Sequence, residues 1–232
     1  MGTKNLLKHE SSRMAAFQLL SECYLMPGTG LLNTLSNLES HMANLSEPAA
    51  KCVRRMGKEI ESDPNVEALK IDFARLFIGP YKLLAAPYGS VYLDAGRTMM
   101  GDSTLDVKER YREAGLDTAE NFKEAPDHIV AELEFMYYLV FKEIEAFSNS
   151  NPETAIGCIR KQQSFLEDHL MRWVPEFADN IIEHAETSFY QNLAKASETF
   201  LKENYIRVCS ALDSVSMQLN SEKFIEINSL RV

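Results

Sequence analysis

The sequence predicts an all-α fold, a single globular multi-helix bundle with one long internal loop. Apolar residues recur at helical spacing in segment after segment, and Gly and Pro residues separate these segments. No stretch alternates apolar and polar residues with a period of two, and no Asn-Gly hairpin signal occurs. We therefore expect helices joined by turns and no sheet.

The first helices are expected at residues 5–26, 31–44, 48–61 and 65–78. Pro27-Gly28 ends the first, Pro48 opens the third and Gly79-Pro80 ends the fourth, because Pro cannot continue a helix and Gly favours its end. The fourth helix carries an apolar stripe formed by Leu69, Phe73, Leu76 and Phe77. Each of these helices is therefore expected to bury one face.

Residues 79–103, GPYKLLAAPYGSVYLDAGRTMMGDS, form a loop rich in Gly, Pro and Tyr. Loops longer than about 12–15 residues without secondary structure are uncommon in compact domains and are often functional or hinge-like. The apolar and aromatic content of this loop predicts that it packs against the helices and lines a site. Its tyrosines are expected to be exposed rather than deeply buried.

Helices resume after the loop. Ser103 and Asp106 have the spacing of a capping box, and Gly115 is placed as a C-terminal stop. Pro126 predicts the first residue of a long helix, since Pro is tolerated at that position. The core face of this helix repeats about every 3.6 residues.

The last helices are also delimited by residues that favour helix ends. Asn151-Pro152 opens one that Pro175 interrupts or kinks, and Thr187 is a candidate N-cap for another. Beyond residue 210 the apolar pattern weakens, which is compatible with a short helix or with disorder. We therefore expect a helical domain at residues 1–210 and a C-terminal tail at 211–232, with the 79–103 loop as a candidate hinge.

Composition excludes several classes of protein. The chain has 232 residues, and its 24 basic and 34 acidic side chains give a formal net charge of −10, which disfavours nucleic acid and anionic membranes as partners. No segment approaches the roughly 18–20 apolar residues of a membrane span, and the N-terminus is too polar for a signal peptide. The four cysteines, which form no Cys-x-x-Cys pair, are expected to be small buried side chains in a reducing compartment: Cys23, Cys52, Cys158 and Cys209.

The stretch EAPDHIVAELEFM, residues 124–136, places an acid and a histidine at the start of the long helix. The first turn has unpaired N–H groups and a positive dipole end, which favour Asp127 and keep His128 neutral. Glu132 lies four residues after His128, so the two share a face. This pattern indicates a polar notch beside an apolar stripe, and a simple helix cap explains it equally well.

No motif supports catalysis or cofactor binding. The other histidines, His9, His41, His169 and His184, form no His-Glu-x-x-His pair, and the chain has no Gly-x-x-x-x-Gly-Lys-Ser/Thr phosphate loop. PGTG at 27–30 follows a helix rather than a strand and is interpreted as a turn. We therefore expect no catalytic residue, no metal and no cofactor.

Five stretches in register resemble the TorD/DmsD family of redox enzyme maturation chaperones. They are FARLFIGPYKLLAAPYGSVYLD (73–94), GDSTLDVKERYREAGL (101–116), EAPDHIVAELEFM (124–136), FLEDHLMRWVPEF (165–177) and ETSFYQNLAKASETFL (186–201). The resemblance covers most of residues 10–205. The first two stretches look closest to the DmsD branch, which serves dimethyl sulfoxide reductase.

The resemblance implies a cytoplasmic, cofactor-free helical chaperone that is not an enzyme. Such proteins bind the twin-arginine (Tat) signal peptide and the apoprotein of a molybdopterin oxidoreductase, and assist cofactor insertion and folding before export. By position, the family's peptide-binding residues fall on Phe73, Leu76, Phe77, Tyr81, Tyr88, Tyr92, Asp127 and His128. Glu132 joins them because, with Asp127, it can meet the arginines of the leader through charge-assisted hydrogen bonds.

Several alternatives stay open. Family members often have Trp where this chain has Phe73, Tyr81 or Tyr88, and an ordinary core role explains Phe73, Leu76 and Phe77 equally well. The runner-up function is an assembly factor of the NarJ type for a nitrate reductase-type complex. The other open class is a nucleotide-using enzyme, since the resemblance allows weak binding of a guanine nucleotide, although no phosphate loop supports this class. The resemblance also allows either a monomer or a domain-swapped dimer hinged at the 79–103 loop.

Overall fold

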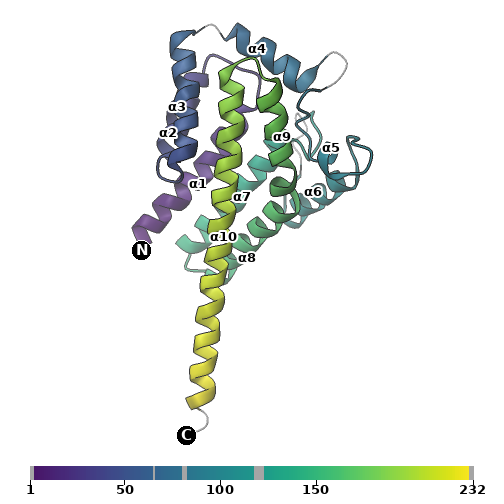
Figure 1. The fold of residues 1–232 in the computed structure, drawn as a ribbon. Helices are drawn as coiled ribbons and strands as arrows, with labels where there is room; N and C mark the ends of the chain where they lie inside the picture. The colour runs from purple at the N-terminus through teal and green to yellow at the C-terminus, as the bar shows by residue number, and fades with distance from the viewer. Residues whose placement is uncertain (1–2, 65, 80–82, 118–122, 230–232) are drawn as a thin grey trace.

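The computed structural model describes the backbone of residues 3–64, 66–79, 83–117 and 123–229, and the side chains of those that lie between residues 5 and 214. Within these ranges the secondary structure is helical, with no strand apart from an isolated antiparallel bridge between Tyr88 and His128. The all-α prediction is therefore confirmed. Figure 1 shows the helices gathered into one bundle, from which the C-terminal part of the last helix extends.

The N-terminal helices agree with the predicted segments. They are α1 (Thr3–Cys23), α2 (Leu31–Met42), α3 (Glu47–Ser62), α4 (Glu67–Phe73) and the π-helical segment η1 (Ala74–Ile78). Ser46 caps α3 by accepting a hydrogen bond from the N–H of Ala49 at 3.2 Å. Gly79 ends η1 with a φ of 55°, a conformation that favours glycine.

In the described part of the 79–103 loop, residues 83–103, Ser90–Leu93 form the short helix α5, and α6 (Asp102–Glu113) begins at the end of the loop. The predicted capping box is wrong, because Gly101 is the N-cap of α6 and makes no side-chain hydrogen bond there. Ser103 already lies in the helix, and its N–H and hydroxyl both donate to Asp94. The predicted stop is confirmed, since Gly115 has a φ of 77° just after α6.

The remaining helices complete the bundle. They are α7 (Ile129–Ser148), α8 (Pro152–Phe165), the π-helical segment η2 (Leu166–Leu170), α9 (Met171–His184) and α10 (Ser188–Ser229). Asn151 caps α8 by accepting from the N–H of Thr154 at 3.1 Å, and Pro175 lies inside α9. The segment expected to be a tail continues α10 as a helix as far as Ser229.

The helix predicted to start at Pro126 starts instead at Ile129. His128 is its N-cap, with an extended backbone and a ring Nδ1 that accepts a hydrogen bond from the N–H of Val130 at 3.2 Å. Asp127 lies outside the helix because its carboxylate accepts from the N–H of Ser90 at 2.7 Å. A tertiary contact therefore replaces the dipole interaction that the local sequence predicted.

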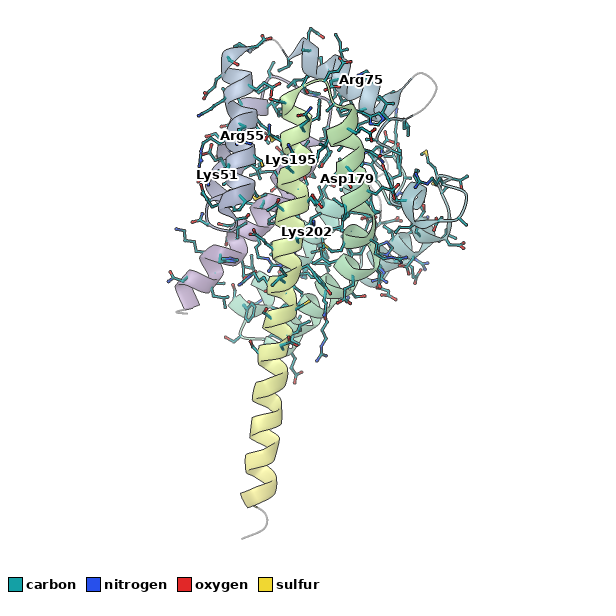
Figure 2. All side chains as sticks on the ribbon, viewed as in Figure 1. Lys51, Arg55, Arg75, Asp179, Lys195 and Lys202 are labelled. Carbon is teal, nitrogen blue, oxygen red and sulfur yellow. The ribbon has the colours of Figure 1, made fainter. Side chains whose placement is uncertain are left out.

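The core lies where α1 packs on α7, α7 on α8, and α10 on α3 and α9. Its largest fully buried side chains include Trp173, Tyr190, Phe17, Phe165, Phe177, Phe189 and Phe200. Charged side chains cover the outer surface of the bundle, as Lys51, Arg55 and Asp179 illustrate (Figure 2).

Two expectations from composition can be compared with the structure. Cys23 is buried, whereas Cys52, Cys158 and Cys209 are only half-buried, and all four are free thiols. The expectation of buried cysteines is therefore met by Cys23 alone.

In the part of the chain that the structure describes, no helix combines the length and the apolar content needed to span a bilayer.

Candidate functional site

A cavity of about 420 Å³ opens between the end of α1, the α4–η1 helix, the 79–103 loop and the start of α7. We call it the aromatic groove. The residues that line it are Tyr24, Phe73, Phe77, Ile78, Leu83, Pro87, Tyr88, Met99, Glu124 and His128. Its walls are therefore aromatic and aliphatic, with polar groups contributed by the two segments around Tyr88 and His128.

The groove brings together four of the predicted peptide-binding residues, Phe73, Phe77, Tyr88 and His128. Four others are not among its lining residues: Leu76, Tyr92, Asp127 and Glu132. Tyr81 lies outside the described residues. The eight described residues of the predicted set thus divide into four that line the groove and four that do not.

Ring contacts between helices hold the back wall of the groove. The ring of Phe77 meets that of Phe73 edge to face at 5.2 Å between centroids, and that of Tyr24 at 6.2 Å. Phe77 and Leu76 are buried, so the core interpretation is correct for Leu76 and partly correct for Phe77. Phe73 is half-buried, and Ile78 is 57% exposed at the edge of the groove.

The opposite wall is fixed where the loop meets the start of α7. Tyr88 and His128 pair across the antiparallel bridge, and their rings lie edge to face with centroids 5.1 Å apart. The N–H of Gly89 donates to the carbonyl of Asp127, and the N–H of Ile129 donates to the carbonyl of Pro87, each at 2.9 Å. Tyr88 is buried, so the predicted exposure of the loop tyrosines is wrong at this position.

A buried polar layer supports this wall from behind. The indole N–H of Trp173 donates to Glu132 Oε2 at 3.0 Å, and Tyr92 stacks on the indole with centroids 5.6 Å apart. A Cβ on Gly89 would lie 3.2 Å from Trp173 Nε1 and 3.3 Å from Glu132 Oε1, so this close approach suits glycine. Glu132 and Asp127 are both fully buried, and contact with a ligand arginine would require them to become accessible.

Burial shifts the pKa values of the polar groups in this region. Desolvation raises the pKa of Glu132 well above its usual range, and the charge of Asp127 adds to this effect, so Glu132 favours its neutral form. Burial lowers the pKa of His128 to about 4, although Glu124 and Asp127 oppose the shift. The neutral histidine expected from the sequence agrees with this direction, and the neutral ring can accept the N-cap hydrogen bond.

The sequence interpretation missed Tyr24, Ile78, Leu83, Pro87, Met99 and Glu124. The sequence contained a signal for Glu124, because this residue opens the stretch that contains Asp127 and His128. It is exposed, and its Oε2 accepts a hydrogen bond from the hydroxyl of Tyr88 at 2.5 Å. Tyr24, at the end of α1, had no local signal because only folding brings it to the groove.

The chemistry available in the groove is that of binding. Aromatic and aliphatic side chains favour an apolar segment of a ligand, and the carboxylate of Glu124 at the edge favours a cation. Among the described residues, no group of three or more His, Cys, Asp or Glu side chains could hold a metal ion. The groove therefore combines an apolar surface with an exposed carboxylate at its edge.

Comparison with known proteins agrees with this architecture. Residues 39–179 match the family model described as nitrate reductase delta subunit. A crystal structure described as a redox enzyme maturation protein from Archaeoglobus fulgidus aligns with a TM-score of 0.53 and 24% identity. That alignment covers 82% of this chain and 93% of the other, and it supports the fold alone.

Curated relatives share part of the chain. The chaperone protein TorD of Vibrio parahaemolyticus is 29% identical over 134 residues, which are 58% of this chain and 61% of the relative. The Tat proofreading chaperone DmsD of Salmonella typhi is 34% identical over 135 residues, 58% of this chain and 59% of the relative. The matched region thus spans about three fifths of these two relatives. The family match extends over more than half of the sequence, and the chain belongs to the TorD/DmsD family of redox enzyme maturation proteins.

Proposed function

We propose that this protein is a cytoplasmic chaperone, and not an enzyme, for a molybdopterin oxidoreductase of the dimethyl sulfoxide reductase type. In this proposal it binds the twin-arginine signal peptide and the apoprotein, and assists cofactor insertion and folding before Tat export. The names of the relatives support the proposal, since they are a chaperone and a Tat proofreading chaperone.

The observation that carries the proposal is the aromatic groove with Glu124 at its edge. A twin-arginine leader is a basic segment followed by an apolar one, and the groove offers a matching carboxylate and apolar walls. The net charge of −10 adds long-range attraction for a basic peptide. In the proposed complex the apolar segment contacts Phe73, Ile78 and Met99.

Glu124 is the proposed partner of a leader arginine, because its carboxylate is exposed. Its hydrogen bond from Tyr88 holds that carboxylate beside the groove before any peptide arrives. Asp127 and Glu132 are proposed to act by positioning, through the hydrogen bonds to Ser90 and Trp173 respectively. Loss of either would displace the wall that carries Tyr88 and His128.

A matched pair of isoleucines tests where the peptide binds. Ile78 is 57% exposed and lines the groove, whereas Ile71 is 63% exposed and does not line it. Burying one such side chain contributes about 1.5–3 kcal/mol, so Ile78→Ser should weaken leader binding by about tenfold or more. Ile71→Ser should leave the affinity unchanged. Equal affinities for the two variants would remove the groove from the proposed site.

The second candidate function is assembly of a nitrate reductase-type complex, which the description of the matching family model favours. Such a factor would bind the N-terminal segment of its reductase, which need not contain two arginines. Titration with N-terminal peptides from both reductase classes separates the candidates. Tighter binding of the nitrate reductase peptide would favour the assembly factor over the export chaperone.

A further inference from the structure

Residues 87–93 lie against the segment that begins α7, and we call them the strap. Tyr88 of the strap lines the aromatic groove. The N–H groups of Gly89 and Ser90 donate to the carbonyl and the carboxylate of Asp127, at 2.9 and 2.7 Å. Hydrogen bonds and ring contacts, rather than a sheet or a long helix, therefore hold this wall of the groove in place.

The contact between the strap and α7 leaves buried oxygens without hydrogen bonds. Among the described residues, Ser90 Oγ, Asp127 Oδ1 and Glu132 Oε1 have no partner, and all three residues are fully buried. A buried oxygen without a hydrogen bond raises the free energy of the closed state, because water would bond to it in an open state. The contact is therefore weaker than its burial alone would make it.

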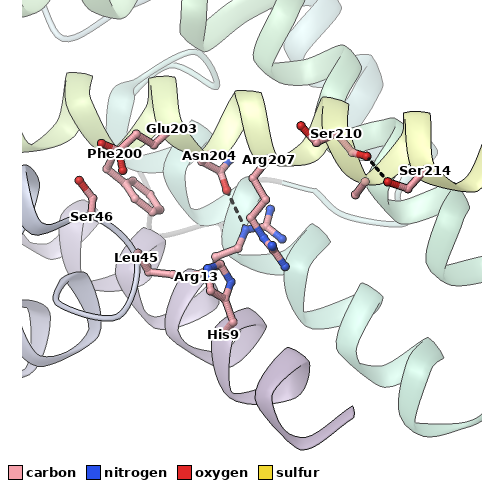
Figure 3. A pocket seen from close by; sticks show the side chains of 11 residues that line it. His9, Arg13, Leu45, Ser46, Phe200, Glu203, Asn204, Arg207, Ser210 and Ser214 are labelled. Carbon is pink, nitrogen blue, oxygen red and sulfur yellow. Dashed lines mark hydrogen bonds between the residues drawn. The ribbon is translucent and has the colours of Figure 1, made fainter. Parts of the chain in front are cut away.

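The charged contact between α1 and α10 differs from the strap in this respect. Arg13 lies there beside a cavity of about 510 Å³ (Figure 3), and it pairs with Glu10 and Glu143. In the part of the chain that the structure describes, Asp127 and Glu132 form no ion pair with a lysine or an arginine. Ion pairs thus close the α1–α10 contact but not the strap contact.

The chain just after the strap has the backbone of a hinge. Gly96 has a φ of 91°, and Arg97 and Met100 have φ values of 52° and 65°, which are uncommon for residues with a side chain. Such strained positions cluster at clamps and switch regions. Arg97 and Met100 are exposed, and Arg97 pairs with Glu176 only at the surface. Little packing therefore holds this turn in place.

Opening of the strap changes the protonation of Glu132. Gly89 covers this side chain, since a Cβ at Gly89 would lie 3.3 Å from Glu132 Oε1. In the closed structure burial raises the pKa of Glu132 well above 4.5, and Asp127 raises it further, although the bond from Trp173 opposes this. Hydration returns the pKa toward 4.5, so opening at neutral pH releases a proton and is favoured as the pH rises.

The other ionisable groups at this contact do not give the same pH dependence. Burial lowers the pKa of His128 to about 4, so its exposure takes up a proton only below pH 6.5. Burial raises the pKa values of the nearby tyrosines, which stay neutral between pH 6.5 and pH 8: Tyr88, Tyr92 and Tyr111. The charged groups that face the strap, Glu132 or these tyrosines are Glu124, Asp127, Glu134, Arg97 and Glu176.

We propose that the strap opens and closes as one unit, and that its opening gates one wall of the aromatic groove and admits water to the two buried carboxyl groups behind it. Opening separates Tyr88 from His128, and Tyr92 leaves its stack on Trp173. The groove is therefore complete only in the closed state. A ligand that contacts Tyr88 and His128 favours closure, a step that for a leader peptide rests on the proposed function.

The test is native-state hydrogen exchange of the full chain by NMR from pH 6.5 to pH 8, with each rate divided by the intrinsic rate at that pH. The amides of Gly89, Ser90 and Ile129 report the strap, because each donates across the contact. They should share one opening constant, which rises with pH by up to about tenfold per unit. The amide of Ala49, in the first turn of α3, should show no such rise.

Two results would overturn the proposal. One is a set of unequal opening constants for the strap amides, or constants that do not change with pH. The other is strap opening no more frequent than that of the amide of Leu133, a fully buried residue inside α7 that reports global unfolding. Neither measurement needs a peptide, so failure of leader binding would leave both readouts unaffected.

Two variants and a control make the test specific. Glu132→Gln keeps an acceptor for Trp173 but does not titrate, so the rise with pH should disappear. Gly89→Ala places a Cβ 3.2 Å from the fully buried Trp173, and should raise the opening constant about fivefold or more while keeping the pH dependence. Gly57→Ala, whose Cβ meets nothing within 4 Å, should leave the opening constant unchanged. A rise with pH that persists in Glu132→Gln would contradict the proton linkage.

Discussion

Tyr88 and His128 pair across the one antiparallel bridge of the described structure, with their rings edge to face and centroids 5.1 Å apart. This pairing fixes the loop to the first residues of α7 and makes one wall of the aromatic groove. The wall depends on a neutral His128, because the ring Nδ1 accepts the N-cap hydrogen bond from Val130. Groove geometry and protonation are therefore coupled.

His128→Asn should reduce the sensitivity of the fold to acid. The pKa of His128 falls from 6.5 to about 4 on folding, so its contribution to stability is complete above pH 6.5 and is lost as the pH falls through this window. Asn keeps an N-cap acceptor but does not titrate. Between pH 7 and pH 5 the wild type should lose roughly 2 kcal/mol more unfolding free energy than the variant. Urea unfolding at both pH values measures this, and parallel losses would contradict it.

Glu132→Gln should have the opposite pH dependence. The folded-state pKa of Glu132 is raised above its usual value of 4.5, so its contribution to stability is complete below that pH and is lost as the pH rises. Gln keeps an acceptor for the indole of Trp173 and carries no charge. The variant should therefore gain stability relative to the wild type as the pH is raised from 5 to 8. A constant difference in unfolding free energy across that range would contradict a raised pKa for Glu132 in the folded state.

Glu124→Gln should weaken leader binding through lost charge. A charge-assisted hydrogen bond contributes about 1.5–3 kcal/mol, which corresponds to roughly tenfold or more in affinity. Glu183→Gln is the matched control, because Glu183 is 76% exposed and does not line the groove. Both variants change the net charge equally, so a difference between them reports a local contact. Calorimetry in low and moderate salt measures it, and equal affinities would indicate long-range attraction alone.

Arg13→Met should destabilise the fold strongly. Glu10 and Glu143 are 1% and 3% exposed, and removal of Arg13 leaves Glu143 without its ion-pair partner and Glu10 with Arg207 alone. Breaking a buried ion pair in this way costs about 3–5 kcal/mol. Arg54→Met is the control, since its pairs with Glu39 and Glu47 lie at the surface and should contribute little. Urea unfolding at pH 7 compares the two variants, and a small loss of unfolding free energy in Arg13→Met would refute a structural role for these buried ion pairs.

Local sequence signals predicted the helices well. The helix start at Asn151-Pro152 and the stop at Gly115 were predicted from one or two residues, because helix ends have strong residue preferences. The predicted helix start at Pro126 was wrong for a physical reason. Its N-terminal signal was local, whereas the carboxylate of Asp127 binds Ser90, a residue 37 positions earlier.

The site was predictable only in part. Family resemblance indicated Phe73, Phe77, Tyr88 and His128, all of which line the groove. Their burial depth and the contributions of Tyr24 and Met99 depend on contacts between distant segments, which periodicity does not encode. The same limit explains why Asp127 and Glu132 were expected to meet a ligand although both are fully buried.

The most direct test of leader binding is a calorimetric titration of the full chain with a twin-arginine leader from a dimethyl sulfoxide reductase-type enzyme. A twin-lysine version and a scrambled peptide are the controls. We predict saturable binding that survives moderate salt, prefers the native leader and loses that preference in Glu124→Gln. Failure of the native leader to bind, or equal binding of the scrambled peptide, would contradict the proposed export-chaperone function and leave the family assignment in place.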